Sequence, residues 1–178
     1  MPTPPTPPAS PPRRLVLLRH AQAEQLGSSD HERALTARGS RDAVAAGRWL
    51  AEQGISPEVA LVSSARRTRS TWAGVADGAG WSLDPVVEDG LYESGPASVL
   101  DLVWATDDAV RTLLVVGHNP TMAMLASTLD DGEGDPDAGN ALALGYPPAS
   151  VAVLDVPGVW TSVQQAALRL TAFHTARG

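Results

Sequence analysis

Two histidines in this chain each follow a short apolar run of the kind that forms a buried strand. Arg19-His20 comes directly after Leu15–Leu18, and His118 follows Leu113–Val116 with one glycine between them. In open α/β sheets, ligands bind at the carboxyl ends of the strands. An arginine beside a histidine at that edge can bind an oxyanion and attack it. The spacing therefore predicts a site to which two strands each deliver a histidine.

The Arg19-His20 pair combines a nucleophile with an anion-binding group. A guanidinium next to an imidazole lowers the pKa of the imidazole, because it disfavours a second positive charge. A neutral imidazole is a nucleophile, whereas its cation is not, and the arginine fork matches the oxygens of a phosphate. The pair is therefore suited to attack at phosphorus through a phosphohistidine. A histidine taken alone is more often structural or at the surface.

A second group of candidate residues lies in Gly117-His118-Asn119-Pro120, where a helix should begin. The amide groups of a helix N-terminus favour a bound anion. We expect His118 to stabilise negative charge on the phosphate oxygens in the transition state. Asn119 either contacts the ligand or caps the helix.

Several arginines follow the strand-like residues 59–62, in Ser63-Ser64-Ala65-Arg66-Arg67 and shortly after it. They should also lie at the carboxyl edge of the sheet. Arg66, Arg67 and Arg69 cannot all face one pocket, so one or two of them belong to a solvated helix end. Arg67 is the expected phosphate ligand.

The composition excludes several other chemistries. The 178 residues include no cysteine, and all 13 cationic residues are arginine. Disulfides, thiolate ligands, cysteine nucleophiles, Schiff bases and the lysine of a P-loop are therefore excluded. The four histidines lie far apart without a metal-ligand spacing, so we expect no metal and no other cofactor.

Charge and hydropathy also limit the partners. A net charge of −7 and a pI near 4.9 argue against nucleic acid as a partner. No apolar run approaches the roughly 20 residues that cross a bilayer, so we expect no membrane insertion. The lack of cysteine and of a secretory signal favours a cytoplasmic location. The oligomeric state stays open.

The elements that must position these residues alternate between strand-like and helix-like segments. Residues 1–12 are rich in proline and should form an extended tail, which leaves 13–178 as one domain. The alternation predicts a single three-layer α/β domain, with a mainly parallel central sheet and helices on both faces. Residues 130–140 are acidic, glycine-rich and without periodicity, which predicts a mobile loop. The expected strands are 14–18, 59–62, 86–88, 113–116, 151–156 and 168–173, and the expected helices end near 53 and 76, cover 98–105 and begin at Pro120.

Four motifs together resemble those of the histidine phosphatase superfamily, specifically its small SixA-type phosphohistidine phosphatases, whose fold is phosphoglycerate-mutase-like. Arg19-His20-Ala21 resembles the Arg-His-Gly/Ala signature, and Leu35-Thr36-Ala37-Arg38-Gly39 resembles the Leu-Thr-x-x-Gly element. Ser63–Arg67 resembles Ser-Pro-x-x-Arg, with serine in place of the proline, and Gly117–Pro120 resembles the second-histidine motif. The resemblance covers residues 14–175 in the family's order.

The resemblance implies a mechanism and a set of roles. His20 would attack the phosphoryl group, and water would then hydrolyse the phosphohistidine, with no metal required. The phosphate-binding positions of the family fall on Arg19, Arg67 and His118. Further phosphate contacts are expected from Thr36 and Asn119.

A general acid is the open part of this mechanism. Leu91-Tyr92-Glu93 resembles the segment that carries the acid in many superfamily members, but Ser94-Gly95-Pro96 departs from the usual continuation. Glu93 is therefore either the acid or a surface carboxylate, and SixA-type enzymes generally work without one. A phosphoramidate releases an imidazole, which is protonated readily near neutral pH, whereas an ester releases an alkoxide that needs a proton donor.

The loop of residues 22–33 follows the nucleophile and could form the rim of the pocket. We expect His31, within this loop, to lie at the surface. His174, near the C-terminus, is expected to have no catalytic role.

Three functions are compatible with these residues. The first is a phosphatase acting on a protein phosphohistidine, because the short chain leaves no room for a large cap over the pocket. The second is a phosphomonoesterase for a small metabolite or nucleotide, with Glu93 as the acid. The third is a module that binds phosphorylated partners without turnover.

Overall fold

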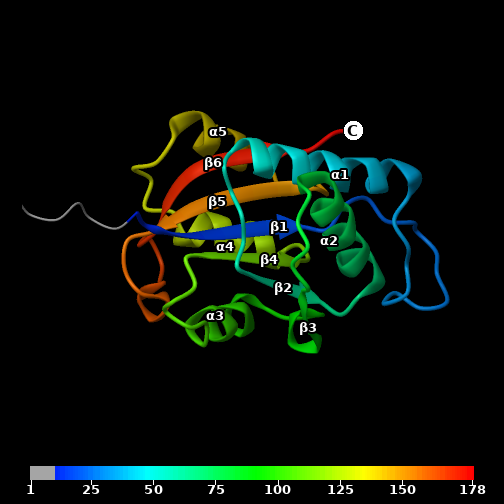
Figure 1. Cartoon of the computed structure of the whole chain (residues 1–178), viewed down its shortest axis with the longest axis horizontal. Coiled ribbons are helices and arrows are strands. Elements are labelled where there is room, and N and C mark those ends of the chain that lie inside the picture. The colour runs from blue at the N-terminus through cyan, green and yellow to red at the C-terminus, as the bar shows by residue number, and fades with distance from the viewer. Residues whose placement is uncertain (1–10) are drawn as a thin grey trace, which may run out of the picture.

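The computed structural model describes residues 11–178, so the proline-rich tail predicted for 1–12 lies almost entirely outside the described residues. Strands and helices alternate along the chain (Figure 1). The elements are β1 (Arg13–Arg19), α1 (Ala37–Glu52), β2 (Val59–Ser63), α2 (Arg66–Ala79), β3 (Val86–Glu88), η1 (Asp89–Leu91), α3 (Pro96–Trp104), β4 (Thr112–Gly117), α4 (Thr121–Leu129), α5 (Pro136–Leu144), β5 (Ser150–Val156), η2 (Trp160–Ser162) and β6 (Arg169–Thr175).

The strands form one six-stranded sheet in the order β3-β2-β4-β1-β5-β6. The neighbours from β3 to β1 pair in parallel, whereas β5 runs antiparallel to both β1 and β6. In the register of β1 and β4, Arg19 lies opposite Gly117. The residues that follow these two, His20 and His118, therefore leave the sheet side by side. The register explains why two residues so far apart in sequence can share a site.

Helices cover both faces of the sheet (Figure 1). Alternate strand residues point to opposite faces. Leu15 and Leu17 of β1 pack in a core with α3, α4 and α5, whereas Val16 and Leu18 pack in a second core with α1 and α2. The expected three-layer architecture is thus confirmed, and the sheet is parallel from β3 to β1 and antiparallel at β5 and β6.

The layer formed by α1 and α2 depends on a close contact between the two helices. A side chain added at Gly47 of α1 would collide with the backbone oxygen of Val75 in α2, and one added at Gly78 of α2 would collide with that of Val44. Glycine at both positions lets the helix backbones touch. This contact fixes α2, which carries Arg67 at its first turn.

Most predicted elements are present, but the mobile loop predicted over 130–140 is wrong in its second half. Helix α5 begins at Pro136 and continues to Leu144. The side chain of Asp135 accepts a hydrogen bond from the amide of Ala138 (2.8 Å), and Pro136 occupies the first turn, where proline costs nothing. Capping by an aspartate and a proline therefore outweighs the poor helix propensity of the glycine in this segment.

Within residues 11–178, no helix is long and apolar enough to cross a membrane.

Candidate active site

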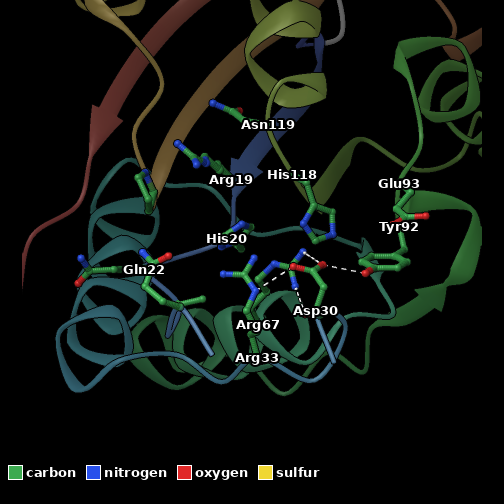
Figure 2. A pocket seen from close by; sticks show the side chains of 13 residues that line it. Arg19, His20, Gln22, Asp30, Arg33, Arg67, Tyr92, Glu93, His118 and Asn119 are labelled. Carbon is green, nitrogen blue, oxygen red and sulfur yellow. Dashed lines mark hydrogen bonds and ion pairs between the residues drawn. The ribbon is translucent and has the colours of Figure 1, made fainter. Parts of the chain in front are cut away.

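A cavity of about 440 Å³ lies at the carboxyl ends of β1, β2 and β4. Figure 2 shows the side chains that line it, which come from these strand ends, from the first turn of α2, from the 22–34 loop, from the loop after β3 and from the segment before β5. Thr36 is the one predicted site residue that does not line it. The other predicted site residues do line it: Arg19, His20, Arg67, Glu93, His118 and Asn119.

His20 is held in one position by its backbone and by its ring. Its amide donates to the carbonyl of Gly117 (3.0 Å), and its own carbonyl accepts from the amide of Ala149 (3.1 Å). The ring atom Nδ1 lies 2.8 Å from the carbonyl oxygen of Ala21, which can only accept a hydrogen bond. The ring proton is therefore on Nδ1, and Nε2 keeps its lone pair for attack.

Burial keeps His20 neutral more than its neighbouring arginine does. Its side chain is almost fully buried, and this desolvation is the largest cause that lowers its pKa to about 4. The charges of Arg67 and Arg19 lower the pKa further, with Arg67 the stronger of the two, while the hydrogen bond to Ala21 opposes the shift. The predicted direction is thus confirmed, but its expected main cause, Arg19, ranks behind burial and behind Arg67.

His118 faces His20 across the cavity, with 5.3 Å between the ring centroids. Its Nε2 shares a hydrogen bond of 2.7 Å with the hydroxyl of Ser63, a fully buried residue at the end of β2. Burial, followed by the charges of His20 and Arg67, lowers the pKa of His118 to about 3. Its other ring nitrogen, Nδ1, is buried and has no hydrogen-bond partner among residues 11–178.

Of the three clustered arginines, only Arg67 enters the cavity. Arg66 and Arg69 are exposed, whereas Arg67 is 5% exposed. Its Nη1 donates to the backbone oxygen of Asp30 (2.7 Å), and its Nη2 lies 3.2 Å from Oδ2 of the Asp30 carboxylate. The structure therefore separates Arg67, the arginine in the cavity, from Arg66 and Arg69 on the solvated helix end, the division expected from their spacing.

Arg19 and Asn119 share one acceptor on the opposite side of the cavity. Nη1 of Arg19 (2.8 Å) and Nδ2 of Asn119 (2.9 Å) both donate to the backbone oxygen of Tyr146. The hydroxyl of Tyr146 is itself tied to the carbonyl of Leu17 in β1 (2.6 Å). Asn119 makes no capping hydrogen bond to α4. Its position in the cavity lining is therefore compatible with a ligand contact, whereas the alternative role as a helix cap is not observed.

Thr36 lies outside the cavity, at the beginning of α1. Its hydroxyl accepts from the amide of Gly39 (2.9 Å) and lies 3.1 Å from Oε1 of Gln22, which does line the cavity. Thr36 is therefore the N-cap of α1 and contacts the site only through Gln22.

Glu93 lies at the rim with an exposed side chain that makes no hydrogen bond among the described residues. Its backbone adopts a left-handed conformation, with φ of 54°. The ring of the preceding Tyr92 lies beside Glu93 and points toward Asp30 in Figure 2, and its hydroxyl donates to Oδ2 of Asp30 (2.8 Å).

Asp30 is the site residue whose importance the sequence did not reveal. Its carboxylate receives hydrogen bonds from Arg67 and Tyr92 and, through Oδ1, from Nε of Arg33 (2.9 Å). The hydroxyl of Tyr92, followed by Arg67 and Arg33, lowers the pKa of Asp30 to about 2. His31, expected at the surface, is partly buried and lies 3.1 Å from the hydroxyl of Ser64.

The arrangement suits a tetrahedral anion. Arg19, Arg67 and His118 all present ring or guanidinium nitrogens at the cavity, and each has one buried nitrogen without a partner among residues 11–178. Charged and neutral N–H donors around a nucleophilic imidazole can hold phosphate oxygens while the imidazole attacks. Within those same residues, no cluster of three or more histidine or carboxylate side chains could hold a metal ion.

Sequence comparisons agree with this chemistry. Residues 15–105 match the family described as the histidine phosphatase superfamily, branch 1. An uncharacterised protein of Mycobacterium tuberculosis is 35% identical over 162 residues, which are 90% of this chain and 100% of that protein. Phosphohistidine phosphatase SixA of Escherichia coli is 30% identical over 129 residues, 69% of this chain and 78% of that protein.

Solved structures give the same result for the fold. A Nakamurella multipartitia protein studied as a candidate phosphohistidine phosphatase SixA superposes with a TM-score of 0.81 and 35% identity, covering 94% of this chain and 99% of that one. The protein histidine phosphatase SixA in complex with tungstate superposes with a TM-score of 0.71 at 23% identity, covering 91% and 96%. With two histidines and two arginines of the family's motifs gathered at one edge of this fold, the chain belongs to the histidine phosphatase superfamily, in its small SixA-type branch, and is a phosphatase.

Proposed function

We propose that this phosphatase hydrolyses phosphohistidine in a protein substrate, with His20 as its nucleophile and without a metal ion. One observation carries the choice of substrate: neither of the two carboxyl groups that line the cavity, Asp30 and Glu93, is held as a proton donor for an alkoxide. Asp30 is ionised throughout the working range, because its pKa lies near 2. Glu93 is exposed at the rim, and no hydrogen bond within residues 11–178 orients its side chain. A leaving group that carries its own proton, such as an imidazole, suits this site best.

The reaction takes place in two displacements. First, Nε2 of His20 attacks phosphorus, so a new N–P bond forms while the N–P bond of the substrate breaks. The substrate ring, already protonated on its other nitrogen, leaves as a neutral imidazole. Water then attacks the phosphohistidine, its proton is lost to solvent or phosphate, and His20 is regenerated with its lone pair. Throughout both displacements the proton stays on Nδ1, which donates its hydrogen bond to the carbonyl of Ala21.

The charge on the transferring group is balanced by Arg19, Arg67 and His118. The two guanidinium groups supply fixed positive charge, and the imidazole of His118 donates a hydrogen bond through Nδ1. Donors that already point at the developing charge reduce the reorganisation that the reaction requires. This provision of charge supports the proposal that no metal is needed.

The decisive experiment compares wild-type protein with His20→Ala on two kinds of substrate. These are a phosphotransfer domain phosphorylated on histidine and a panel of small phosphate esters, both followed by phosphate release. We expect rapid turnover of the phosphohistidine by wild-type protein, slow ester cleavage, and loss of both activities in His20→Ala. Ester cleavage that depends on His20 without phosphohistidine turnover would contradict the proposal.

A phosphomonoesterase is the second candidate, and the place of Glu93 in the cavity lining favours it. If Glu93 protonates an alkoxide, Glu93→Gln should lower ester hydrolysis by about 10²-fold or more and leave phosphohistidine turnover nearly unchanged. An unchanged ester rate would remove this candidate.

A stoichiometric burst of phosphate release from either substrate would exclude the third candidate, a module that binds phosphorylated partners without turnover.

A further inference from the structure

The 22–34 loop is fastened to the rest of the site through two adjacent residues, Asp30 and His31. The carbonyl of His31 accepts from the amide of Arg66 (2.9 Å), and its ring contacts Ser64. Asp30 joins the loop to α2 through Arg67 and to the segment after β3 through Tyr92 (Figure 2). Three segments that are distant in sequence therefore meet at one carboxylate.

The contact between Asp30 and Arg67 places an anion on the arginine that is proposed to bind the anionic substrate. Arg67 has three groups of donors. Nη1 is occupied by the backbone oxygen of Asp30, Nη2 by its carboxylate, and the buried Nε has no partner among residues 11–178. Nη2 carries two N–H groups, and a phosphoryl oxygen that approaches it on the side of Asp30 competes with the carboxylate.

The two contacts of Asp30 with Arg67 differ in how easily they can be given up. The backbone contact is the shorter one, at 2.7 Å against 3.2 Å for the carboxylate, and it belongs to the main chain of the fastened loop. The Asp30 side chain is 55% exposed, and its carboxylate keeps hydrogen bonds from Tyr92 and Arg33 when it loses the one from Arg67. Asp30 can therefore release Nη2 without leaving its charge unpaired.

We propose that Asp30 is an internal counter-anion of the phosphate site, which pairs with Arg67 in the free enzyme and yields Nη2 to the phosphoryl oxygens of a bound substrate. This inference rests on the proposed role of Arg67 as a phosphate ligand. In the free enzyme the carboxylate holds the guanidinium in place and balances its charge. With phosphate bound, the same carboxylate repels it, since two anions then face one arginine.

The counter-anion affects the last step of the reaction, in which inorganic phosphate leaves the site. Inorganic phosphate is the product, and an arginine pocket without a competing anion would hold it tightly. A carboxylate that returns to Nη2 lowers the affinity for free phosphate and speeds its release. Asp30 thus acts as a positioning residue for Arg67 that also limits product inhibition.

The test is the affinity of the purified full-length protein for inorganic phosphate, measured by isothermal titration calorimetry at fixed ionic strength. Asp30→Asn keeps the size and hydrogen-bonding capacity of the side chain but removes its charge. We expect Asp30→Asn to bind phosphate roughly fivefold more tightly than wild-type protein, as removal of a nearby like charge dictates. A purely structural role for Asp30 predicts the opposite sign, because a disordered Arg67 binds phosphate more weakly.

Glu32→Gln is the matched control, since it removes the same charge from the same loop. Glu32 pairs with His31 (2.9 Å) and does not line the cavity, so its variant should bind phosphate as wild-type protein does. Unchanged or weaker binding by folded Asp30→Asn, or equal tightening by Glu32→Gln, overturns the proposal. Should Asp30→Asn fail to fold, Asp30→Ser removes the charge with a smaller side chain and is judged by the same sign.

Phosphate binding needs no turnover, so this result is independent of the substrate proposed above. If no phosphohistidine is hydrolysed but Asp30→Asn binds phosphate more tightly, the substrate proposal fails and the counter-anion stands. If turnover is found, the inhibition constant for phosphate should fall by the same factor in Asp30→Asn. Turnover with a normal inhibition constant in that variant would contradict the counter-anion alone.

Discussion

Ser63 determines which nitrogen of His118 can face the phosphate. Its buried hydroxyl lies 2.7 Å from Nε2 of His118, and a neutral imidazole carries only one proton. If the hydroxyl donates to Nε2, the proton of His118 is on Nδ1 and is free to bind a phosphate oxygen. We therefore expect Ser63→Ala to lower kcat roughly tenfold, the worth of one hydrogen bond in the transition state.

The control for Ser63 is Ser63→Thr, which keeps the hydroxyl and should retain most of the activity. Steady-state kinetics should place the loss in Ser63→Ala on kcat and leave KM nearly unchanged, because ground-state binding by Arg19 and Arg67 is intact. A variant that merely loosened the fold would lower its melting temperature and raise KM as well. That pattern would refute a specific role for the hydroxyl.

The residues that follow β1, β2 and β4 could be placed from the sequence, because short spacing and strand register determine where they go, whereas Thr36 in the remaining motif lies outside the cavity. His20 and His118 meet because Arg19 pairs with Gly117, and both follow recognisable apolar runs. The contact between Asp30 and Tyr92 joins residues 62 positions apart through a side-chain hydrogen bond, and nothing in either local sequence indicates it. Such long-range polar contacts become visible only when the loops are placed in space.

At the scale of single elements, the beginning of α1 is stabilised by Thr36. Its hydroxyl caps the helix through the amide of Gly39, so Thr36→Ala should lower the free energy of unfolding by about 1 kcal/mol. Urea denaturation followed by circular dichroism measures this loss. Thr36→Ser should restore most of it, because serine presents the same oxygen.

The variant Thr36→Ala also tests whether the N-cap residue of α1 contacts the substrate. Since Thr36 contacts the cavity only through Gln22, we expect Thr36→Ala to change the affinity for phosphate by less than about twofold. A tenfold weaker affinity with unchanged stability would show that Thr36 binds phosphate directly, as the sequence analysis expected.

The helices differ in how well their sequences revealed them. The predicted core face of α4 is present, because Met122, Leu125 and Leu129 repeat with helical spacing and are buried. Helix α5 was not predicted, because its acidic and glycine-containing segment has little apolar periodicity. Its capping residues, Asp135 and Pro136, were the available signal.

At the scale of the whole molecule, the two site histidines couple stability to pH. Their pKa values in the folded state are about 4 for His20 and about 3 for His118, against about 6.5 in the unfolded chain. Between those values the unfolded chain binds more protons, so the free energy of unfolding should be constant above about pH 6.5 and fall as the pH drops toward 4. Activity should fall only near pH 4, where His20 itself becomes protonated and loses its lone pair.

Urea denaturation at pH 7.5, 6 and 4.5 measures the acid loss of stability. His20→Gln replaces the titrating ring with a neutral side chain and should show a shallower loss than wild-type protein. If wild-type protein and His20→Gln lose stability in parallel, other groups are responsible and the assignment to His20 is wrong.

The strand order could not be obtained from the sequence, although the layers could. Alternating strands and helices predict parallel pairing, which holds from β3 to β1. Helix α5 and the segment before Tyr146 return the chain to the edge of the sheet that carries the site, so β5 runs antiparallel to β1. This path depends on packing between distant parts of the chain. That reversal brings the carbonyl of Tyr146 to Arg19 and Asn119.

The two ends of the loop that carries Asp30 are hydrogen-bonded to each other, which forms a closed neck where the loop leaves and re-enters the fold. Ala23 forms an antiparallel bridge with Leu35, and the amide of Glu24 donates to the carbonyl of Ala34 (2.8 Å). Because the neck is closed, we expect changes in length or composition between these pairs to leave β1 and α1 in place, provided that Asp30 and His31 keep their contacts with α2. The enzyme is thus divided into a reaction centre on the sheet and an exchangeable part beside it, and a transplant of this loop between relatives should transfer substrate preference while the nucleophile stays untouched.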